Sequence, residues 1–151
     1  MQLNTDQQQK YQDTLDSLAQ HHVRFTPQRR AIIKYLICSD RHPSAEDIYD
    51  DLLDDFDSLS LATVYNNLRL LVKLNVVKEL KSGGGASHYD FELNKHYHVI
   101  CRGCGRIMDL DYPMLTSLEN FAAERTGYRV DGHQIEFYGL CPLCLEKQQA
   151  K

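Results

Sequence analysis

Two Cys-X-X-Cys pairs, Cys101–Cys104 and Cys141–Cys144, stand in the last third of the chain. Each pair forms a turn that can aim two thiolates at one point, so two pairs can build a closed, tetrahedral zinc site. The segment between the pairs is too long for a compact zinc ribbon and has room for a helix and strands. We therefore expect a structural Zn²⁺ that holds a small C-terminal domain together.

Other uses of these cysteines are less compatible with the sequence. Two disulfides would require an oxidising compartment, and the polar start Met1-Gln2-Leu3-Asn4 does not resemble a signal peptide. A redox-active pair would sit where a helix begins after a buried strand, whereas Cys104-Gly105-Arg106 resembles a knuckle that turns into a strand. The fifth cysteine, Cys38, lies in an apolar run and is expected to be a small buried side chain.

Histidines lie just before the first cysteine pair. The segment His96-Tyr97-His98-Val99-Ile100 alternates as a strand does, so His96 and His98 share one face and Cys101 lies on the other. Asp109 falls on the expected return strand, next to the paired histidines. Two metal sites could therefore use the same strand without sharing an atom.

The N-terminal half predicts three consecutive helices that would position a polar surface. Thr26-Pro27 offers an N-cap before a proline at the first helical position, and Ser44-Ala45-Glu46-Asp47 resembles a capping box. The third helix begins near Ser60 and is apolar on one side. Its other side is predicted to face outward and carries Thr63, Tyr65, Asn66, Asn67, Arg69 and Lys73.

A glycine-tipped hairpin follows, from Val76–Leu80 to His88–Phe91. Three helices and a hairpin are the order of a winged helix-turn-helix. Its third helix would enter the major groove, with Thr63, Tyr65 and Asn66 near base edges. Arg69 and Lys73 would then lie near phosphates. A solvated polar face on an ordinary helical bundle is the alternative, but an exposed tyrosine beside two asparagines and no acid favours the groove.

Composition and charge are those of an ordinary globular protein with uneven charge. Of 151 residues, 42% are hydrophobic and 25% are charged. No apolar segment approaches the roughly 20 residues of a membrane span, so we expect a cytoplasmic protein without membrane contact. The net charge of −4 argues against a uniformly basic DNA-binding protein. Basic stretches at 23–36 and 60–81 nevertheless flank an acidic stretch at 44–57.

The C-terminal half predicts strands on either side of one helix. A return strand at 106–110 precedes a helix that starts at Tyr112-Pro113 and ends near Gly127, and a strand at 134–140 delivers Cys141. We expect an α+β chain with a winged-helix DNA-binding domain and N-terminal helix at 1–91, a hinge at 92–95 and a small α/β dimerisation and metal-binding domain at 96–151.

Taken together, four motifs resemble the ferric uptake regulator (Fur) family. They are Arg24-Phe25-Thr26-Pro27-Gln28-Arg29, Ala62-Thr63-Val64-Tyr65-Asn66-Asn67-Leu68, His96-Tyr97-His98-Val99-Ile100-Cys101 and Tyr138-Gly139-Leu140-Cys141. The resemblance spans about residues 23–145. It implies a homodimer that binds palindromic operator DNA through the winged helix, with Arg24 and Arg29 as further DNA contacts.

Within that family the sequence resembles the regulatory site of the peroxide-responsive branch. The resemblance implies five ligands for Fe²⁺ or Mn²⁺: His42, Asp90, His96, His98 and Asp109. It also implies that His42 and His96 are the oxidation-sensitive positions. Iron-uptake regulators usually place glutamate where Asp109 stands, and zinc-uptake regulators tend to use a cysteine for one regulatory oxygen. Three imidazoles and two carboxylates suit Fe²⁺ or Mn²⁺ and leave a sixth position open for peroxide.

The function implied is metal-dependent repression that ends when iron-catalysed oxidation of a ligand histidine releases the operator. The alternative within the family is an iron- or manganese-responsive repressor of metal uptake without peroxide sensing. A non-haem iron oxygenase would have suitable ligands but leaves the winged helix unexplained, so we expect neither an enzyme nor a small organic substrate. A zinc-stabilised interaction module would show no salt-dependent DNA affinity. The sequence leaves open the operator, the regulated genes, the physiological metal, the role of residues 1–20 and any metal role of His88 or His133.

Overall fold

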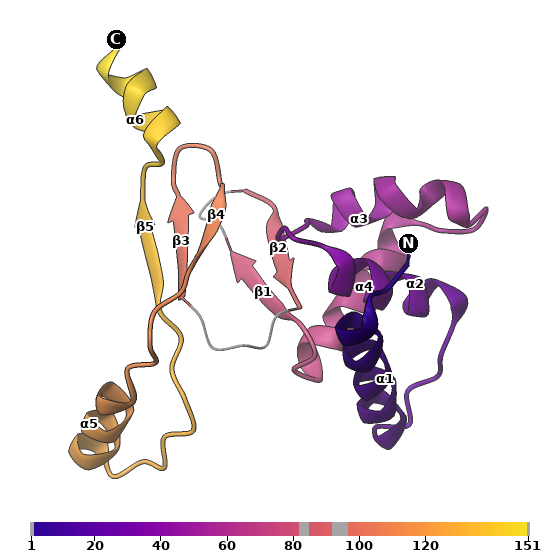
Figure 1. Cartoon of the computed structure of the whole chain (residues 1–151), viewed down its shortest axis with the longest axis horizontal. Coiled ribbons are helices and arrows are strands. Elements are labelled where there is room, and N and C mark those ends of the chain that lie inside the picture. The colour runs from indigo at the N-terminus through magenta and orange to yellow at the C-terminus, as the bar shows by residue number, and fades with distance from the viewer. Residues whose placement is uncertain (1, 82–84, 92–96, 151) are drawn as a thin grey trace. The chain divides into compact units, whose positions relative to one another are not determined.

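The computed structural model describes residues 2–81, 85–91 and 97–150. It divides the chain into two compact units, the N-terminal unit Met1–Leu93 and the C-terminal unit Asn94–Lys151. Figure 1 shows helices predominating in the first unit and a three-stranded sheet in the second, which confirms the α+β class. The predicted hinge at 92–95, most of the hairpin tip and the predicted ligand His96 lie outside the described residues.

Four α-helices and one short 3-10 helix build most of the N-terminal unit. They are α1 (Thr5–Gln20), α2 (Pro27–Cys38), α3 (Ala45–Leu52), η1 (Leu53–Asp55) and α4 (Leu61–Lys73). Each α-helix begins after a polar side chain that accepts a backbone N–H of the first turn. The four caps are Asn4, Thr26, Ser44 and Ser60, and the last three confirm the predicted start signals.

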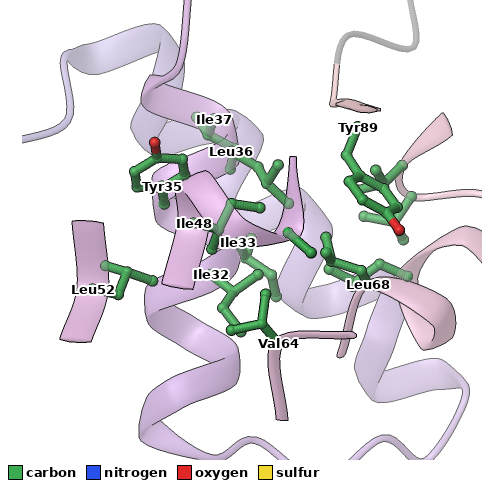
Figure 2. Close-up of a cluster of buried hydrophobic side chains, with 14 of the residues drawn as sticks. Ile32, Ile33, Tyr35, Leu36, Ile37, Ile48, Leu52, Val64, Leu68 and Tyr89 are labelled. Atoms are coloured by element: carbon green, nitrogen blue, oxygen red, sulfur yellow. The ribbon is translucent and has the colours of Figure 1, made fainter. Parts of the chain in front are cut away.

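The N-terminal unit has an apolar core of its own (Figure 2). Ile32 and Ile33 of α2, Ile48 of α3 and Val64 and Leu68 of α4 are all fully buried there. Burying one such side chain contributes about 1.5–3 kcal/mol relative to leaving it exposed. The core therefore holds α4 by one face and leaves its opposite face on the surface.

A two-stranded hairpin completes the N-terminal unit. Strand β1 (Lys78–Lys81) pairs antiparallel with β2 (Ser87–Asp90), in the register Lys78↔Asp90 to Lys81↔Ser87. Tyr89 belongs to the same apolar core as the helices, so β2 packs onto the helical part. The predicted winged-helix order of three helices and a hairpin is thus present, preceded by α1.

One residue of α4 differs from its predicted placement. Asn67, expected to face outward, is only 5% exposed. Its side chain donates to the Thr63 carbonyl and accepts from Arg29, so the burial of this polar group is matched by hydrogen bonds. Cys38, expected to be buried, is half-buried at the end of α2.

The C-terminal unit is a sheet with a helix beyond each end (Figure 1). Strand β3 (Tyr97–Cys101) is central, antiparallel to β4 (Ile107–Leu110) and parallel to β5 (Glu136–Gly139). These strands confirm the predicted ones, and the helices are α5 (Thr116–Thr126) and α6 (Pro142–Gln149).

The start of α5 corrects the sequence prediction of Tyr112-Pro113. The helix begins at Thr116 because Leu115 has a non-helical backbone and its N–H donates to the Tyr97 hydroxyl at 3.0 Å. The predicted end is confirmed, with Gly127 in the left-handed conformation. Helix α6 was not predicted, although its first residue, Pro142, was a usable signal.

The C-terminal unit buries few side chains. Among its described residues, those that are buried are Tyr97, His98, Ile100 and Cys101. Large exposed apolar side chains are instead abundant: Val99, Met108, Leu110, Tyr112, Leu115, Leu118, Phe121, Tyr128, Phe137, Tyr138, Leu143 and Leu145. Contiguous exposed apolar patches are typical of surfaces that associate with another protein. No helix in the described part of the chain has the length and apolar character needed to cross a membrane.

Candidate metal centres

The strand arrangement of the C-terminal unit brings the four paired cysteines together. Because β3 and β5 are parallel, Cys101 at the end of β3 pairs with Gly139 at the end of β5. The Arg102 N–H donates to the Gly139 carbonyl at 2.7 Å and joins the two strand ends. Cys141 follows as the N-cap of α6. The four sulfur atoms all lie within 4.8 Å of one another, and they belong to Cys101, Cys104, Cys141 and Cys144.

The geometry of this cluster fits a tetrahedral zinc ion. Sulfurs about 2.3 Å from one Zn²⁺ lie about 3.8 Å apart at the corners of a tetrahedron. The Cys104 and Cys141 sulfurs are 3.7 Å apart. A Cβ on Gly103 would lie 2.9 Å from the Cys144 sulfur, so the first knuckle is packed directly against the opposite pair. The cluster is the predicted four-cysteine structural zinc site.

The pKa values of two thiols in this cluster, Cys101 and Cys144, are shifted in opposite directions. The Cys141 N–H donates to the Cys101 sulfur at 3.2 Å and, with further N–H groups of the knuckle, lowers the pKa of Cys101 to about 6. Hydrogen bonds from the Cys144 thiol to the Cys141 and Cys101 sulfurs raise the pKa of Cys144 to about 12. The site thus favours one thiolate and disfavours a second, because the negative charges repel each other. A bound divalent cation would offset this repulsion.

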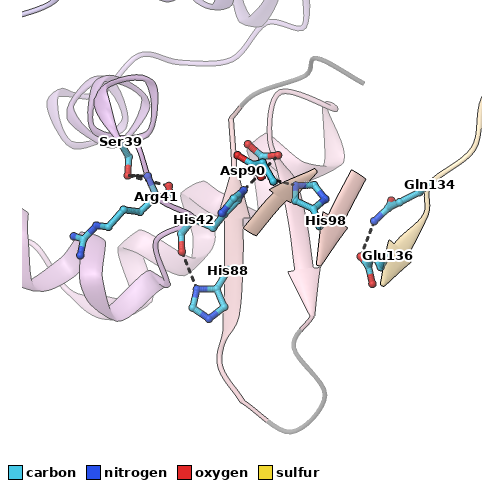
Figure 3. A network of polar contacts seen from close by, with 9 residues as sticks. Ser39, Arg41, His42, His88, Asp90, His98, Gln134 and Glu136 are labelled. Atoms are coloured by element: carbon cyan, nitrogen blue, oxygen red, sulfur yellow. Dashed lines mark hydrogen bonds and ion pairs between the residues drawn. The ribbon is translucent and has the colours of Figure 1, made fainter. Parts of the chain in front are cut away.

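A histidine–aspartate pair lies in the N-terminal unit. His42 Nε2 and Asp90 Oδ2 are 3.9 Å apart and both side chains are largely buried. Figure 3 shows how the backbone positions this pair: the His88 ring donates from Nδ1 to the His42 carbonyl at 2.8 Å. The Tyr89 N–H donates to the Pro43 carbonyl at 2.9 Å and fixes the same segment against β2.

A second histidine–aspartate pair lies in the C-terminal unit. His98 of β3 is directly opposite Asp109 of β4, as the strand pattern predicted. Their Nε2 and Oδ1 atoms are 3.5 Å apart, with His98 buried and the Asp109 side chain 51% exposed. Both pairs have separations compatible with two ligands that each lie about 2.1 Å from one ion. Each unit therefore carries a His/Asp pair that could hold a metal ion.

The two histidines left open by the sequence both make hydrogen bonds. His88 supports the His42 backbone, as described. His133 Nε2 lies 2.9 Å from the Tyr97 hydroxyl and its Nδ1 lies 2.9 Å from Glu119 Oε1. This network joins β3, α5 and the segment before β5. Sequence reasoning missed Glu119, because nothing in the local pattern links it to a residue so far along the chain.

The predicted DNA-reading side chains fall on α4 and its neighbourhood. Asn66, Arg69, Lys73 and Arg24 are exposed or half-buried, as is Thr63. The Tyr65 hydroxyl donates to Glu46 Oε1 of α3 at 2.8 Å, and this bond raises the pKa of Tyr65. The guanidinium of the other predicted contact, Arg29, bonds within the unit.

The chain thus has a helical unit with the winged-helix order and a small sheet unit with a four-cysteine site. Each unit also has a His/Asp pair that could hold a metal, and this combination is typical of metal-responsive transcription regulators. The sequence profile of the Ferric uptake regulator family matches residues 20–138, and the chain belongs to this family. The chain is 47% identical over 136 residues to the peroxide-responsive repressor PerR of Staphylococcus saprophyticus, covering 90% of this chain and 92% of that one. It is thus a homologue of peroxide-responsive repressors and not an enzyme.

Solved structures agree with this placement. One solved structure concerns peroxide sensing and gene regulation by PerR from Streptococcus pyogenes. That protein is 43% identical with a TM-score of 0.54, and the match covers 89% of this chain and 92% of that one. The Helicobacter pylori ferric uptake regulator Fur is 22% identical with a TM-score of 0.77, covering 96% and 97%. The second likeness supports the fold alone.

Proposed function

We propose that this chain is a cytoplasmic, homodimeric, metal-dependent repressor that binds palindromic operator DNA and releases it when peroxide oxidises a ligand histidine. The observation that carries the proposal is the ligand set. It has short aspartates at positions 90 and 109, histidines at 42 and 98 and a separate four-cysteine site, in a chain homologous to peroxide-responsive repressors.

DNA binding is assigned to residues 1–91. Helix α4 would lie in the major groove, with Thr63, Tyr65 and Asn66 toward base edges. The surface cations would neutralise phosphates: Arg24, Arg69 and Lys73. This positive charge is local, since the chain as a whole has a net charge of −4. The affinity for DNA should therefore fall with salt concentration by an amount set by these few phosphate contacts.

Dimerisation is assigned to residues 96–151. The exposed apolar side chains of this unit, such as Phe121, Tyr128 and Phe137, are the support for it. A second copy of the chain would bury them, and a two-fold dimer would present two copies of α4 to the two halves of a palindrome.

The regulatory ion is assigned to His42, Asp90, His96, His98 and Asp109. Two of these residues precede the hinge at 92–95 and three follow it, so one Fe²⁺ or Mn²⁺ bound by all five would restrict the orientation of the two units. Metal would then favour the dimer geometry that fits the operator, by as much as its affinity differs between orientations.

Iron, when bound, would supply the redox chemistry that activates peroxide. The protein supplies the target: a ring C–H of His42 or His96 would become C–OH as one H₂O₂ is reduced to water, so the oxidised ring gains one oxygen atom. An oxidised ring is a poorer ligand, the ion is lost and the operator is released. Manganese, which does not cleave peroxide readily, should leave both rings intact.

Mass spectrometry of peptides containing His42 and His96 tests the proposal. The iron-loaded protein, treated with dilute H₂O₂, should show one added oxygen atom, and the manganese-loaded protein should show none. Asp109→Glu should keep metal-dependent DNA binding and lose much of the oxidation, because the longer chain could occupy the open position. Unmodified histidines in fully iron-loaded protein would favour the alternative, an iron- or manganese-responsive repressor of metal uptake.

A further inference from the structure

A partly buried polar link joins α2 to α4. Arg29 Nε donates to Asn67 Oδ1 at 2.7 Å, and Asn67 Nδ2 donates to the Thr63 carbonyl at 2.8 Å. We propose that Arg29 is a positioning residue that fixes the orientation of α4, so that it governs discrimination between operator and other DNA rather than contacting a phosphate. This inference rests on the proposed DNA binding and adds a residue that determines specificity.

The guanidinium bonds to two separate segments. Besides Asn67 in α4, it donates from Nη1 to the carbonyl of Arg24, in the segment that leads into α2. Arg29 itself sits in the first turn of α2, where its N–H binds the Thr26 cap at 3.2 Å. One planar group on α2 therefore bonds to two other parts of the unit, a geometry that a lysine ammonium cannot reproduce.

Asn67 is an unusual choice for its position. Asparagine is a poor helix former, and its neighbours on the buried face of α4, Val64, Leu68 and Leu71, are all apolar. A leucine there would contribute apolar burial without needing partners. The buried amide is satisfied only when Arg29 and Thr63 are in place, so it favours one orientation of α4 over others that an apolar contact would tolerate.

The orientation of α4 matters because the base-reading side chains move with it. Tyr65 and Asn66 directly precede Asn67, and Thr63 supplies the carbonyl that Asn67 binds. A small rotation of α4 would misalign all three against the base edges together, while a flexible cation such as Lys73 could still reach a phosphate. Burial also lowers the pKa of Arg29, as expected for a guanidinium held against protein.

The test compares affinity for operator and for unrelated duplex DNA over a series of salt concentrations, using the full-length, zinc- and manganese-loaded protein. Arg29→Lys and Asn67→Leu should each lower operator affinity by about tenfold or more, from the loss of a charge-assisted hydrogen bond. The affinity of each variant for unrelated DNA should change by less than about twofold. A further variant, Arg29→Gln, removes the charge, and the slope of its log affinity against log salt concentration should match that of the wild type. The double variant Arg29→Lys, Asn67→Leu should lose no more than either single variant.

Arg30→Gln is the matched control. Arg30 is the next residue, is exposed and stacks over Phe25 rather than bonding to α4, so its loss should leave the ratio of the two affinities unchanged. Retained affinity for unrelated DNA serves as the folding control for every variant.

The outcomes that overturn the proposal are specific. If Arg29→Gln lowers both affinities alike and reduces the salt slope by about one, while Arg29→Lys restores binding, Arg29 contacts a phosphate. Wild-type discrimination in Asn67→Leu would also overturn it, because the link would then have no role in reading. A wild-type protein that does not discriminate operator from other DNA would instead refute the proposed function.

Discussion

The two units of this chain achieve stability by different means. The N-terminal unit buries large aliphatic side chains from α1 to α4 in a core of its own. The C-terminal unit exposes most of its large apolar side chains and brings four cysteines together at the end of β3 and β5. The first unit resembles an independent small domain, whereas we propose that the second depends on a metal and on a second copy.

This difference suggests how regulation can be kept separate from folding. A small domain with few buried residues commonly needs a disulfide, a metal or oligomerisation to be stable. Here zinc would serve that role, and the proposed His/Asp ligands could then gain and lose their ion without unfolding either unit. The comparison predicts different consequences for substitutions in each unit.

The largest effect is expected from Cys101→Ser. Structural zinc contributes about 10–16 kcal/mol of apparent binding free energy in small domains, more than the free energy of unfolding of many whole proteins. Zinc content, dimerisation and operator affinity should therefore be lost together, as measured by metal analysis, sedimentation and DNA titration. Cys38→Ser, outside the cluster, should keep all three. A stable, zinc-free dimer of Cys101→Ser would contradict the dependence on metal.

Leu68→Ala should damage the other unit alone. Leu68 is fully buried in the core of the N-terminal unit, and its truncation should cost about 2–5 kcal/mol of unfolding free energy. Calorimetry should show one transition shifted down in temperature, with zinc content unchanged. The half-exposed Leu53 provides the control, since Leu53→Ala should shift neither transition appreciably. Zinc loss in Leu68→Ala would show that the units are not independent in stability.

A smaller effect is expected for Tyr97→Phe in the C-terminal unit. The change removes the hydroxyl that binds His133 and accepts the Leu115 N–H, at a cost of about 1–3 kcal/mol for partners left unsatisfied. Hydrogen exchange should rise at the start of α5 and stay unchanged in α4. Tyr112→Phe is the control, because Tyr112 is exposed. If hydrogen exchange at Leu115 is unchanged, the Tyr97 hydroxyl does not stabilise the start of α5.

The smallest effects are expected on the surface of α4. Lys73→Ala should weaken binding to all DNA sequences alike and lower the salt slope by about one. Tyr65→Ala should instead reduce discrimination among operator sequences, as competition with mutated operators would measure. Specific binding that is untouched by Tyr65→Ala would show that α4 does not read the operator in the proposed way.

Local signals predicted most of the fold and the zinc site. The caps at Thr26, Ser44 and Ser60 and the two cysteine pairs need only near neighbours in sequence to be recognised. What could not be predicted depends on distant contacts. Asn67 is buried because Arg29, far away in sequence, reaches it, and α5 starts late because Tyr97 holds Leu115. The proposal that His42 and Asp90 are ligands came from family resemblance, since no local pattern identifies them.

The most direct test of the central claim is operator affinity measured with Fe²⁺ and with Mn²⁺, before and after dilute peroxide. We predict tight binding with either metal before treatment, and irreversible loss of at least about tenfold in affinity after treatment in the iron-loaded protein alone. Zinc content should remain unchanged throughout, because the four-cysteine cluster is a separate site. Equal operator affinity before and after peroxide in the iron-loaded protein would contradict the account.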